Sequence, residues 1–447
     1  MACTRFAAFC TILVVAAPLA AQRATRAQRE LGEHLFAETA LGNPGSSFQA
    51  ACDTCHKSGK DPRGRGELYY SDGEEVSLLP AAGSRAQDTT LRNTPALADL
   101  ELGSRFGRDG RYASLEELLQ DKLVSSHIGW KAADRERAID LLQTNLLNEP
   151  NSDYEQLFRA AYRLDIEELS PQGVYEATAI ALANYLRLIR SELTSGWDAF
   201  ADMNRIPIGP ARDEAPKHYA GRIAGRISNQ EGRVLIKRPM GFGQDAYEGF
   251  KTFFRVDGDA SVGNCVSCHV PPSFTDNLFH NTGISQADYD SRHGDGAFNE
   301  LEVPGPDTTR PRPSLLANPS SGDRNLADLG YWNWVDPATA PERGEGEGAA
   351  DLLKRLVGAF RTPSLRNLAR TRPYMHNGAY DSIEDAVTEI VRINQLARDG
   401  KLRSISPEYE VMKLSPGDIP HLTAFLESMD EVDADTFREL LLNFESD

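Results

Sequence analysis

The chain has 447 residues, with 48 basic and 66 acidic side chains and a net charge of −18 at neutral pH. Its length suggests two or three domains, and a composition of 40% hydrophobic and 26% charged residues excludes a wholly disordered or collagen-like chain. Because so acidic a protein repels phosphate backbones, nucleic acid is not an expected partner.

Residues 1–21 are predicted to be a secretory signal peptide. Arg5 precedes a short, mostly apolar run at 6–17, and the small residues at 18–21 offer a cleavage site. The run is too short to span a bilayer, although an uncleaved membrane anchor is the alternative interpretation. No later segment reaches spanning length, so we expect an exported, periplasmic protein whose mature chain does not span the membrane.

Two short motifs contain every cysteine that follows this segment: residues 52–56 read Cys-Asp-Thr-Cys-His, and residues 265–269 read Cys-Val-Ser-Cys-His. Two thiols at this spacing can form thioethers with the vinyl groups of one porphyrin, and the adjacent histidine then ligates the iron. A zinc site would not require the histidines, and a thioredoxin-like motif needs a strand–helix context that is absent here. We therefore expect two covalently bound haem c groups. The predicted attachment and iron-ligating residues are Cys52, Cys55 and His56 in the first motif and Cys265, Cys268 and His269 in the second.

A second repeat follows each haem motif. Residues 92–97 read Arg-Asn-Thr-Pro-Ala-Leu, and residues 361–365 read Arg-Thr-Pro-Ser-Leu. A glycine follows each Thr-Pro pair at the same interval, and a serine follows each glycine. These serines, Ser114 and Ser382, each precede an acidic residue by three positions, which predicts a capped helix. Each half is therefore expected to be one haem unit with a long loop, a Thr-Pro turn and a capped helix.

The two copies differ just before the repeated glycine, where Tyr374, Met375 and His376 correspond to a Phe-Gly-Arg run at 106–108. Methionine as sixth ligand raises the potential of a histidine-ligated haem and leaves no open coordination site. Met375 is therefore the candidate ligand, Tyr374 and His376 are neighbours that could replace it, and a core methionine is the alternative. The asymmetry predicts that the second haem relays electrons, whereas the first presents an open iron to a small oxidant.

The remaining elements indicate a mainly α fold, because no segment shows sustained alternation of apolar and polar residues. Long helices are expected from Pro171, which follows the N-cap Ser170, and at 383–396 and 416–429. The polar stretch 286–350 is expected to be a long functional or interface loop. We divide the chain into the signal peptide, a first haem domain at 22–195, a linker at 196–240, a second haem domain at 241–432 and a tail at 433–447.

In its motifs and their order, the chain resembles the superfamily of bacterial di-haem cytochrome c peroxidases that includes MauG. The matching stretches are residues 52–56, 92–97, 109–117, 265–269, 279–283, 360–367 and 373–376. The resemblance implies two cytochrome c-like α domains, a low-potential N-terminal haem that reacts with peroxide and a high-potential C-terminal haem that accepts electrons. It also implies a calcium ion between the domains, held by the Asn93 side chain and by backbone carbonyls near Arg361 and Pro363. Alternatively, Asn93 caps the turn that follows it.

The chain departs from the superfamily pattern at three places. The tryptophan that commonly lies between the haems is replaced by Arg108. The stretch that usually carries an active-site glutamate reads Ser-Ser-His-Ile-Gly-Trp at 125–130, and no histidine lies between His56 and His127. His127 is therefore a candidate distal acid–base group, a displaceable sixth ligand of the first iron, or an ordinary histidine at a helix end. His280 matches a superfamily position and is expected to be structural.

The expected activity is reduction of H2O2 to water at the first haem. Electrons would come from a small soluble cytochrome c or cupredoxin and pass through the second haem, and the acidic chain favours a basic patch on that donor. One alternative is MauG-like oxidation of a partner protein through Tyr331, Trp332 and Trp334. Another is a non-enzymatic di-haem electron carrier, which the missing tryptophan and glutamate favour. Superfamily members are often dimers, so the resemblance allows a homodimer here, but the sequence does not decide it.

Overall fold

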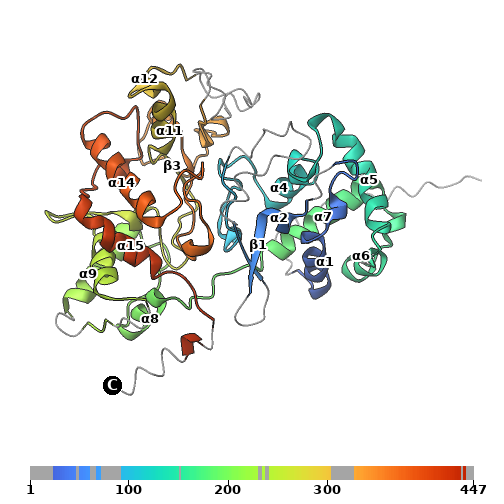
Figure 1. The fold of residues 1–447 in the computed structure, drawn as a ribbon, viewed down its shortest axis with the longest axis horizontal. Helices are drawn as coiled ribbons and strands as arrows, with labels where there is room; N and C mark the ends of the chain where they lie inside the picture. The colour runs from blue at the N-terminus through green and yellow to red at the C-terminus, as the bar shows by residue number, and fades with distance from the viewer. Residues whose placement is uncertain are drawn as a thin grey trace, which may run out of the picture.

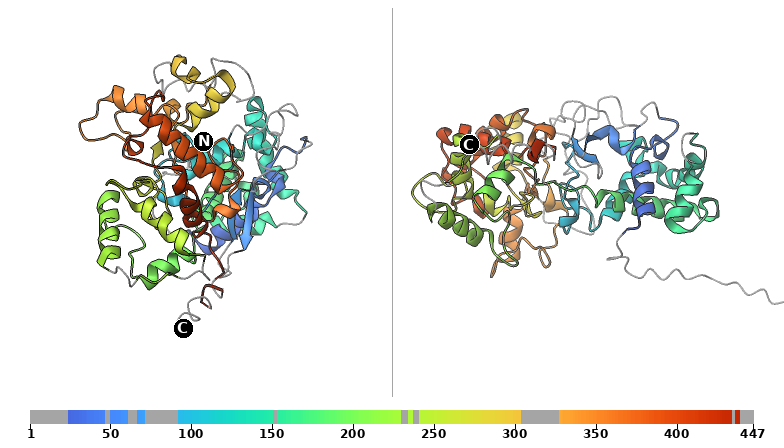
Figure 2. Two further views of the ribbon diagram at one scale, coloured as in Figure 1. Left: turned by 60° about the vertical axis from the view of Figure 1, so that its left-hand side comes forward. Right: turned by 90° about the horizontal axis from the view of Figure 1, so that it is seen from below.

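The computed structural model describes residues 24–46, 50–60, 67–71, 92–150, 153–229, 234–236, 241–303, 327–433 and 436–438. The predicted signal peptide and most of the predicted tail lie outside the described residues. Figure 1 shows two helical lobes side by side, one formed by the N-terminal helices and one by the later helices. The two further views in Figure 2 show the same separation.

The first lobe is built on a crossing of two helices. Its elements are α1 (Arg26–Phe36), α2 (Cys52–Cys55), β1 (His56–Lys60), β2 (Glu67–Ser71), α4 (Leu115–Lys122), α5 (Arg135–Leu147), α6 (Tyr154–Tyr162) and α7 (Pro171–Leu186). Helices α1 and α7 can pack closely because Gly32 has no side chain. A Cβ at Gly32 would lie 2.2 Å from the Ala181 carbonyl oxygen, which is too short for a real contact. Ser114 and Ser170 cap α4 and α7, accepting the N–H groups of Glu117 and Gly173.

The second lobe repeats this crossing. Its elements are α8 (Gly196–Met203), α9 (Pro216–Asn229), α10 (Gln244–Phe254), β3 (Phe279–His280), α11 (Ile284–His293), α12 (Ala297–Glu300), α13 (Ala349–Arg355), β4 (Phe360–Arg361), α14 (Ile383–Arg398) and α15 (Ile419–Glu427). A Cβ at Gly249 of α10 would lie 1.9 Å from the His421 carbonyl oxygen of α15. Ser382 caps α14, and Phe250 and Phe425 pack together in the core beneath it.

Two stretches differ from the expectations for loops and linkers. The segment 196–240, expected to be a linker, supplies α8 and α9 to the second core, where Trp197 and Tyr219 are fully buried. The Gly, Pro and Arg content of this segment favoured a linker. The burial of its apolar residues depends on helices distant in the sequence, so it could not be predicted from the segment alone. The stretch 286–350, expected to be a loop, contains most of α11, all of α12 and the start of α13, and Trp332 packs in a small core there.

The predicted mainly α fold is confirmed. In the described part of the chain, the strands form only two antiparallel pairs, β1 with β2 and β3 with β4. None of the described helices has the length and apolar character needed to cross a membrane. Each lobe has its own large hydrophobic core, which agrees with one helical unit for each haem motif.

Candidate haem sites on a shared cavity

Both Cys-x-x-Cys-His motifs line a single cavity of about 980 Å³. The first motif begins on α2, and the second begins on a 3-10 turn at Cys265–Ser267. Much of the cavity wall is apolar, including Phe36, Leu97, Leu119, Leu182, Phe253, Leu368, Ile390 and Leu426. None of the four cysteines forms a disulfide. Paired thiols and a histidine on an apolar cavity are the arrangement that covalent haem attachment requires, so the residues present fit two haem c groups.

The two motif histidines are held in the neutral form. Burial lowers the pKa of His56 to about 4, against a smaller opposing effect of the Pro95 carbonyl. Burial likewise lowers the pKa of His269, and the Pro363 carbonyl, which belongs to the second Thr-Pro turn, opposes it. His269 Nδ1 lies 3.0 Å from the Phe274 carbonyl oxygen, which orients its ring. A neutral imidazole is the form that ligates iron, so both residues suit the predicted role.

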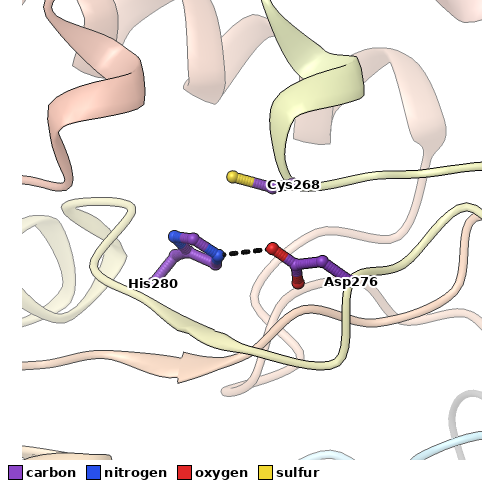
Figure 3. Close-up of side chains that lie close together, drawn as sticks. All are labelled: Cys268, Asp276 and His280. Carbon is purple, nitrogen blue, oxygen red and sulfur yellow. Dashed lines mark hydrogen bonds and ion pairs between the residues drawn. The ribbon is translucent and has the colours of Figure 1, made fainter. Parts of the chain in front are cut away.

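Asp276 and His280 form a small polar cluster beside Cys268, an attachment cysteine of the second motif (Figure 3). His280 Nε2 lies 2.8 Å from Asp276 Oδ2, and candidate ligand atoms of Cys268, Asp276 and His280 lie within 4.8 Å of one another. Burial alone would lower the pKa of His280, but the hydrogen bond to Asp276 and the nearby Cys268 and Glu408 side chains raise it well above its ordinary value. A protonated imidazole does not ligate metals. The cluster is therefore a support for the second motif, which agrees with the structural role expected of His280.

The repeated turn has the same backbone in both halves. In the first copy, Phe106 bridges to Tyr112 across the turn, and in the second, Tyr374 bridges to Tyr380. The residue that follows Phe106 in the first copy and Tyr374 in the second has a positive φ, 81° at Gly107 and 68° at Met375. Left-handed backbone is unstrained for glycine but costs other residues roughly 1–2 kcal/mol. The second copy thus keeps a long side chain at a position that glycine would occupy without strain.

Met375 is placed better than its neighbours to ligate the second iron. All three residues line the cavity that also contains His269, so their other contacts distinguish them. The Tyr374 hydroxyl donates to the Leu368 carbonyl oxygen at 2.8 Å. The His376 ring stacks on Phe360 with a centroid separation of 3.7 Å. Both neighbours therefore have other contacts, and backbone strain at Met375 is the kind of local cost that functional positions retain.

Reciprocal hydrogen bonds join the two halves at these turns. The Asn93 N–H donates to the His376 carbonyl oxygen at 2.8 Å, and the Arg361 N–H donates to the Arg108 carbonyl oxygen at 2.8 Å. Asn93 and Arg361 both precede a Thr-Pro pair, and Arg108 and His376 both follow the left-handed residue. The two haem units thus meet through equivalent contacts. We call this contact, formed by Arg92, Asn93, Arg108, Phe360, Arg361 and His376, the joint.

Asn93, the candidate calcium ligand, lies in the joint and is only 4% exposed. Its amide nitrogen donates to the Pro373 carbonyl oxygen, whereas its buried amide oxygen has no hydrogen-bond partner among the described residues. An unpartnered oxygen is a group that calcium binds. The Arg108 guanidinium, whose Nε lies 2.6 Å from the Asn93 backbone oxygen, places a positive charge beside it. The Asn93 amide oxygen is therefore suited to bind calcium, whereas the positive charge of Arg108 opposes the binding of a cation there.

His127 lines the cavity from a 3-10 turn at Ser126–Ile128 that follows α4. Its Nδ1 lies 3.2 Å from Ser125 Oγ. His127 is exposed to the cavity, and the nearby Lys122 ammonium is the main cause that lowers its pKa to about 3. The imidazole is therefore neutral near pH 7, where it can accept a proton or ligate iron but is a poor proton donor. The sequence did not single out Lys122, because nothing local shows that its side chain turns toward the cavity.

Comparisons with known proteins agree with this geometry. Residues 26–205 match the di-haem cytochrome c peroxidase family. The chain is 25% identical over 406 residues to the cytochrome-c peroxidase IdrP2 of Denitromonas iodatirespirans, covering 90% of this chain and 80% of that protein. It is 25% identical over 399 residues to the methylamine utilization protein MauG of Methylorubrum extorquens, covering 89% and 77%. The diheme peroxidase BthA of Burkholderia thailandensis has a similar fold, with a TM-score of 0.54 and 18% identity over 92% of this chain and 87% of that one.

The family match spans the first haem unit, and the two relatives align across both units. The resemblance to the bacterial di-haem cytochrome c peroxidase and MauG superfamily is therefore confirmed, and with it the prediction of a cytochrome-c peroxidase-like oxidoreductase. The likeness to BthA confirms the predicted pair of cytochrome c-like α domains. A di-haem family implies two haem c cofactors, whereas the particular residues that hold them stay a prediction.

Proposed function

We propose that the chain reduces H2O2 to two molecules of water, taking two electrons from a small soluble donor and two protons from solvent. When bound, the haem groups supply the redox chemistry, with peroxide reacting at the first site and electrons entering at the second. The difference between Gly107 and Met375 carries this proposal. The same turn presents a thioether to the second site and no side chain to the first, so only the first site keeps room for a small oxidant.

The residues beside the first site are suited to receive peroxide. His127 is neutral near pH 7 because Lys122 lowers its pKa, so its imidazole keeps a lone pair that can accept a hydrogen bond, and in the reaction a proton, from an incoming peroxide. Lys122 also lines the cavity and adds a positive charge near the proton acceptor. Together they replace the glutamate that the superfamily usually places in this region. We assign His127 the role of distal proton acceptor rather than that of a resident ligand.

Steady-state turnover tests the proposal. Purified holoprotein is mixed with H2O2 and a reduced small c-type cytochrome that has a basic surface, and donor oxidation is followed. We expect saturable turnover in the wild type and its loss in Gly107→Met. Peroxide consumption with oxidation of a partner protein but not of the donor would replace the proposal with MauG-like chemistry. Absence of any peroxide consumption would replace it with electron transfer alone.

We also propose that residues 1–21 direct export to the periplasm, where the donor is encountered. The net charge of −18 favours a donor with a basic contact surface. N-terminal sequencing of the secreted protein should begin near Gln22, and retention of Met1 would contradict cleavage. Light scattering of the mature protein would decide between a monomer and the homodimer that the superfamily suggests.

The calcium assignment is tested separately. Asn93 would offer its amide oxygen, joined by backbone carbonyls near Arg361 and Pro363. We expect metal analysis after exhaustive dialysis to find calcium in the wild type and to find less in Asn93→Ala. Equal and negligible calcium in both proteins would show that Asn93 only joins the two halves.

A further inference from the structure

Arg108 and Arg361 line the cavity at the joint, one from each half of the molecule. Arg108 Nε donates to the Asn93 carbonyl oxygen at 2.6 Å, and its Nη2 donates to the Thr94 carbonyl oxygen at 3.4 Å. Arg361 Nη2 donates to the Asn277 amide oxygen. Within the described part of the chain, these partners are all neutral, and neither guanidinium forms an ion pair.

Both guanidinium groups remain charged at neutral pH. Burial, with the nearby Arg92 as a second cause, lowers the pKa of Arg108 to about 10. Burial also lowers the pKa of Arg361 to about 10, against a weaker attraction from Asp276. A lowered arginine pKa means that the surroundings disfavour the positive charge. The cavity wall at the joint therefore contains two cations that the described protein groups do not compensate.

Two other arginines, the partly buried Arg92 and the buried Arg366, have carboxylate partners. Arg92, also in the joint, makes two hydrogen bonds of 2.7 Å to Asp328 and lies 2.7 Å from Asp109. Arg366 makes two hydrogen bonds of 2.8 Å to Asp198. Attraction to these carboxylates raises the pKa of both arginines, although burial opposes it. Because an uncompensated charge is costly even when it is only partly buried, the contrast points to an anion that completes the wall at the other two arginines.

We propose that Arg108 and Arg361 bind carboxylates, and that these are propionate side chains of the two haem groups. The planar fork of arginine matches a carboxylate and can hold it with two parallel hydrogen bonds. Each haem brings two propionates into the cavity that both arginines line. At Arg108 the chain thus places a charge where the superfamily commonly has an aromatic bridge. The inference rests on haem attachment at the two motifs and is independent of peroxide reduction.

The pair also affects the reduction potential of the haem groups. A ferric haem carries one more positive charge than a ferrous haem, so a fixed guanidinium nearby favours the ferrous form. Replacing arginine with glutamine keeps hydrogen-bonding capacity but removes the charge. The expected change is a shift of about tenfold in the ferric–ferrous equilibrium toward ferric, which corresponds to a midpoint potential lower by ~59 mV for one electron.

Spectroelectrochemical titration of Arg108→Gln and Arg361→Gln tests the proposal. The ratio of covalent haem to protein is measured first, and a wild type without covalent haem would overturn the premise. Each variant should lower the midpoint potential of one haem. The potential in Arg108→Lys should fall by no more than half of the decrease seen in Arg108→Gln. The matched control is Arg187→Gln, which loses an ion pair to Glu116 away from the cavity and should leave both potentials unchanged.

Resonance Raman spectra identify the anion independently of the potentials. The haem propionate bending bands should shift in Arg108→Gln and Arg361→Gln and stay in place in Arg187→Gln. Potentials and bands that match the control in both joint variants would overturn the proposal. A wild-type protein whose potentials respond to added acetate would show that the pair binds a free carboxylate, which would overturn the propionate assignment.

Discussion

Gly107 and Met375 occupy equivalent positions in the two copies of one turn, with φ angles of 81° and 68°. The hydrogen bonds that close the turn are also equivalent, because the N–H of Gly110 donates to Gly107 and that of Gly378 donates to Met375, each at 3.3 Å. Because the turns have the same backbone, the side chain at this one position determines which group the turn places at each haem site. In the proposed function, the Met375 thioether closes the second site and Gly107 leaves the first accessible.

Gly107→Met should transfer the closed state to the first site. A Cβ at Gly107 would lie 3.3 Å from the nearest atom, a carboxylate oxygen of Asp109, so the turn can accept a side chain with a small adjustment. We expect a second methionine–iron absorption band, peroxide reactivity reduced by at least about tenfold, and a stability loss of roughly 1–2 kcal/mol from the positive φ. Gly107→Ala is the control, and it should share the strain but keep the reactivity. Equal reactivity in the two variants would contradict the account.

Met375→Ala should open the second site and lower its potential. Axial ligands span a range of about 0.8 V in haem proteins, and loss of a thioether should lower the midpoint potential of this haem by on the order of 0.1 V. Spectroelectrochemistry measures the change, and the haem next to His56 serves as the internal reference. An unchanged potential together with an unchanged methionine–iron band would show that Met375 is a core residue.

Lys122→Gln should change the pH dependence of the peroxide reaction. Lys122 is the largest cause of the lowered pKa of His127, so its removal should bring that pKa up toward ~6.5. The imidazole then becomes charged as the pH falls through the raised pKa, and the proton acceptor is lost. We expect kcat/KM to stay flat between about pH 5 and 8 in the wild type and to fall on the acid side in the variant.

His127→Gln is the companion to that measurement. If His127 accepts the proton, the variant should lose about 10²–10⁴-fold in rate and lack the acid limb when combined with Lys122→Gln. An acid limb that persists in the double variant would assign the titration to another group. A His127→Gln protein with wild-type rates would place His127 among ordinary histidines at helix ends.

Arg92→Gln should destabilise the contact between the two lobes. Its guanidinium holds Asp328 and Asp109, whose side chains are 15% and 7% exposed, so its loss leaves two nearly buried carboxylates unpaired. We expect the free energy of unfolding to fall by about 3–5 kcal/mol, with partial recovery when Asp328→Asn is added. Arg159→Gln removes an exposed ion pair with Asp165 and should change the stability much less, because solvent screens that pair. Similar losses in the two single variants would contradict the ion-pair explanation.

The local signals in the sequence predicted what local structure decides. Ser114, Ser170 and Ser382 cap the helices expected of them, because a cap depends on residues three positions away. The repeat of the Thr-Pro turn and the glycine likewise predicted two equivalent units. Cys-x-x-Cys-His spacing predicted both cavity-lining motifs, because its chemistry is confined to five adjacent residues.

Features that depend on distant residues could not be predicted in this way. Trp197 and Tyr219 are buried by helices from elsewhere in the chain, so the segment containing them was interpreted as a linker. The bond between Arg92 and Asp328 joins residues 236 positions apart. The effect of Lys122 on His127 and the neutral hydrogen-bond partners of Arg108 likewise become evident only when side chains from different elements meet at the cavity.

The most direct test of peroxide chemistry at the first site is a stopped-flow experiment on half-reduced holoprotein mixed with one equivalent of H2O2. Our account predicts rapid, stoichiometric loss of the ferrous signal in the wild type and in the control variant Gly107→Ala, and no rapid phase in Gly107→Met. Slow bleaching that is equal in all three proteins would contradict peroxide reduction at an open first site.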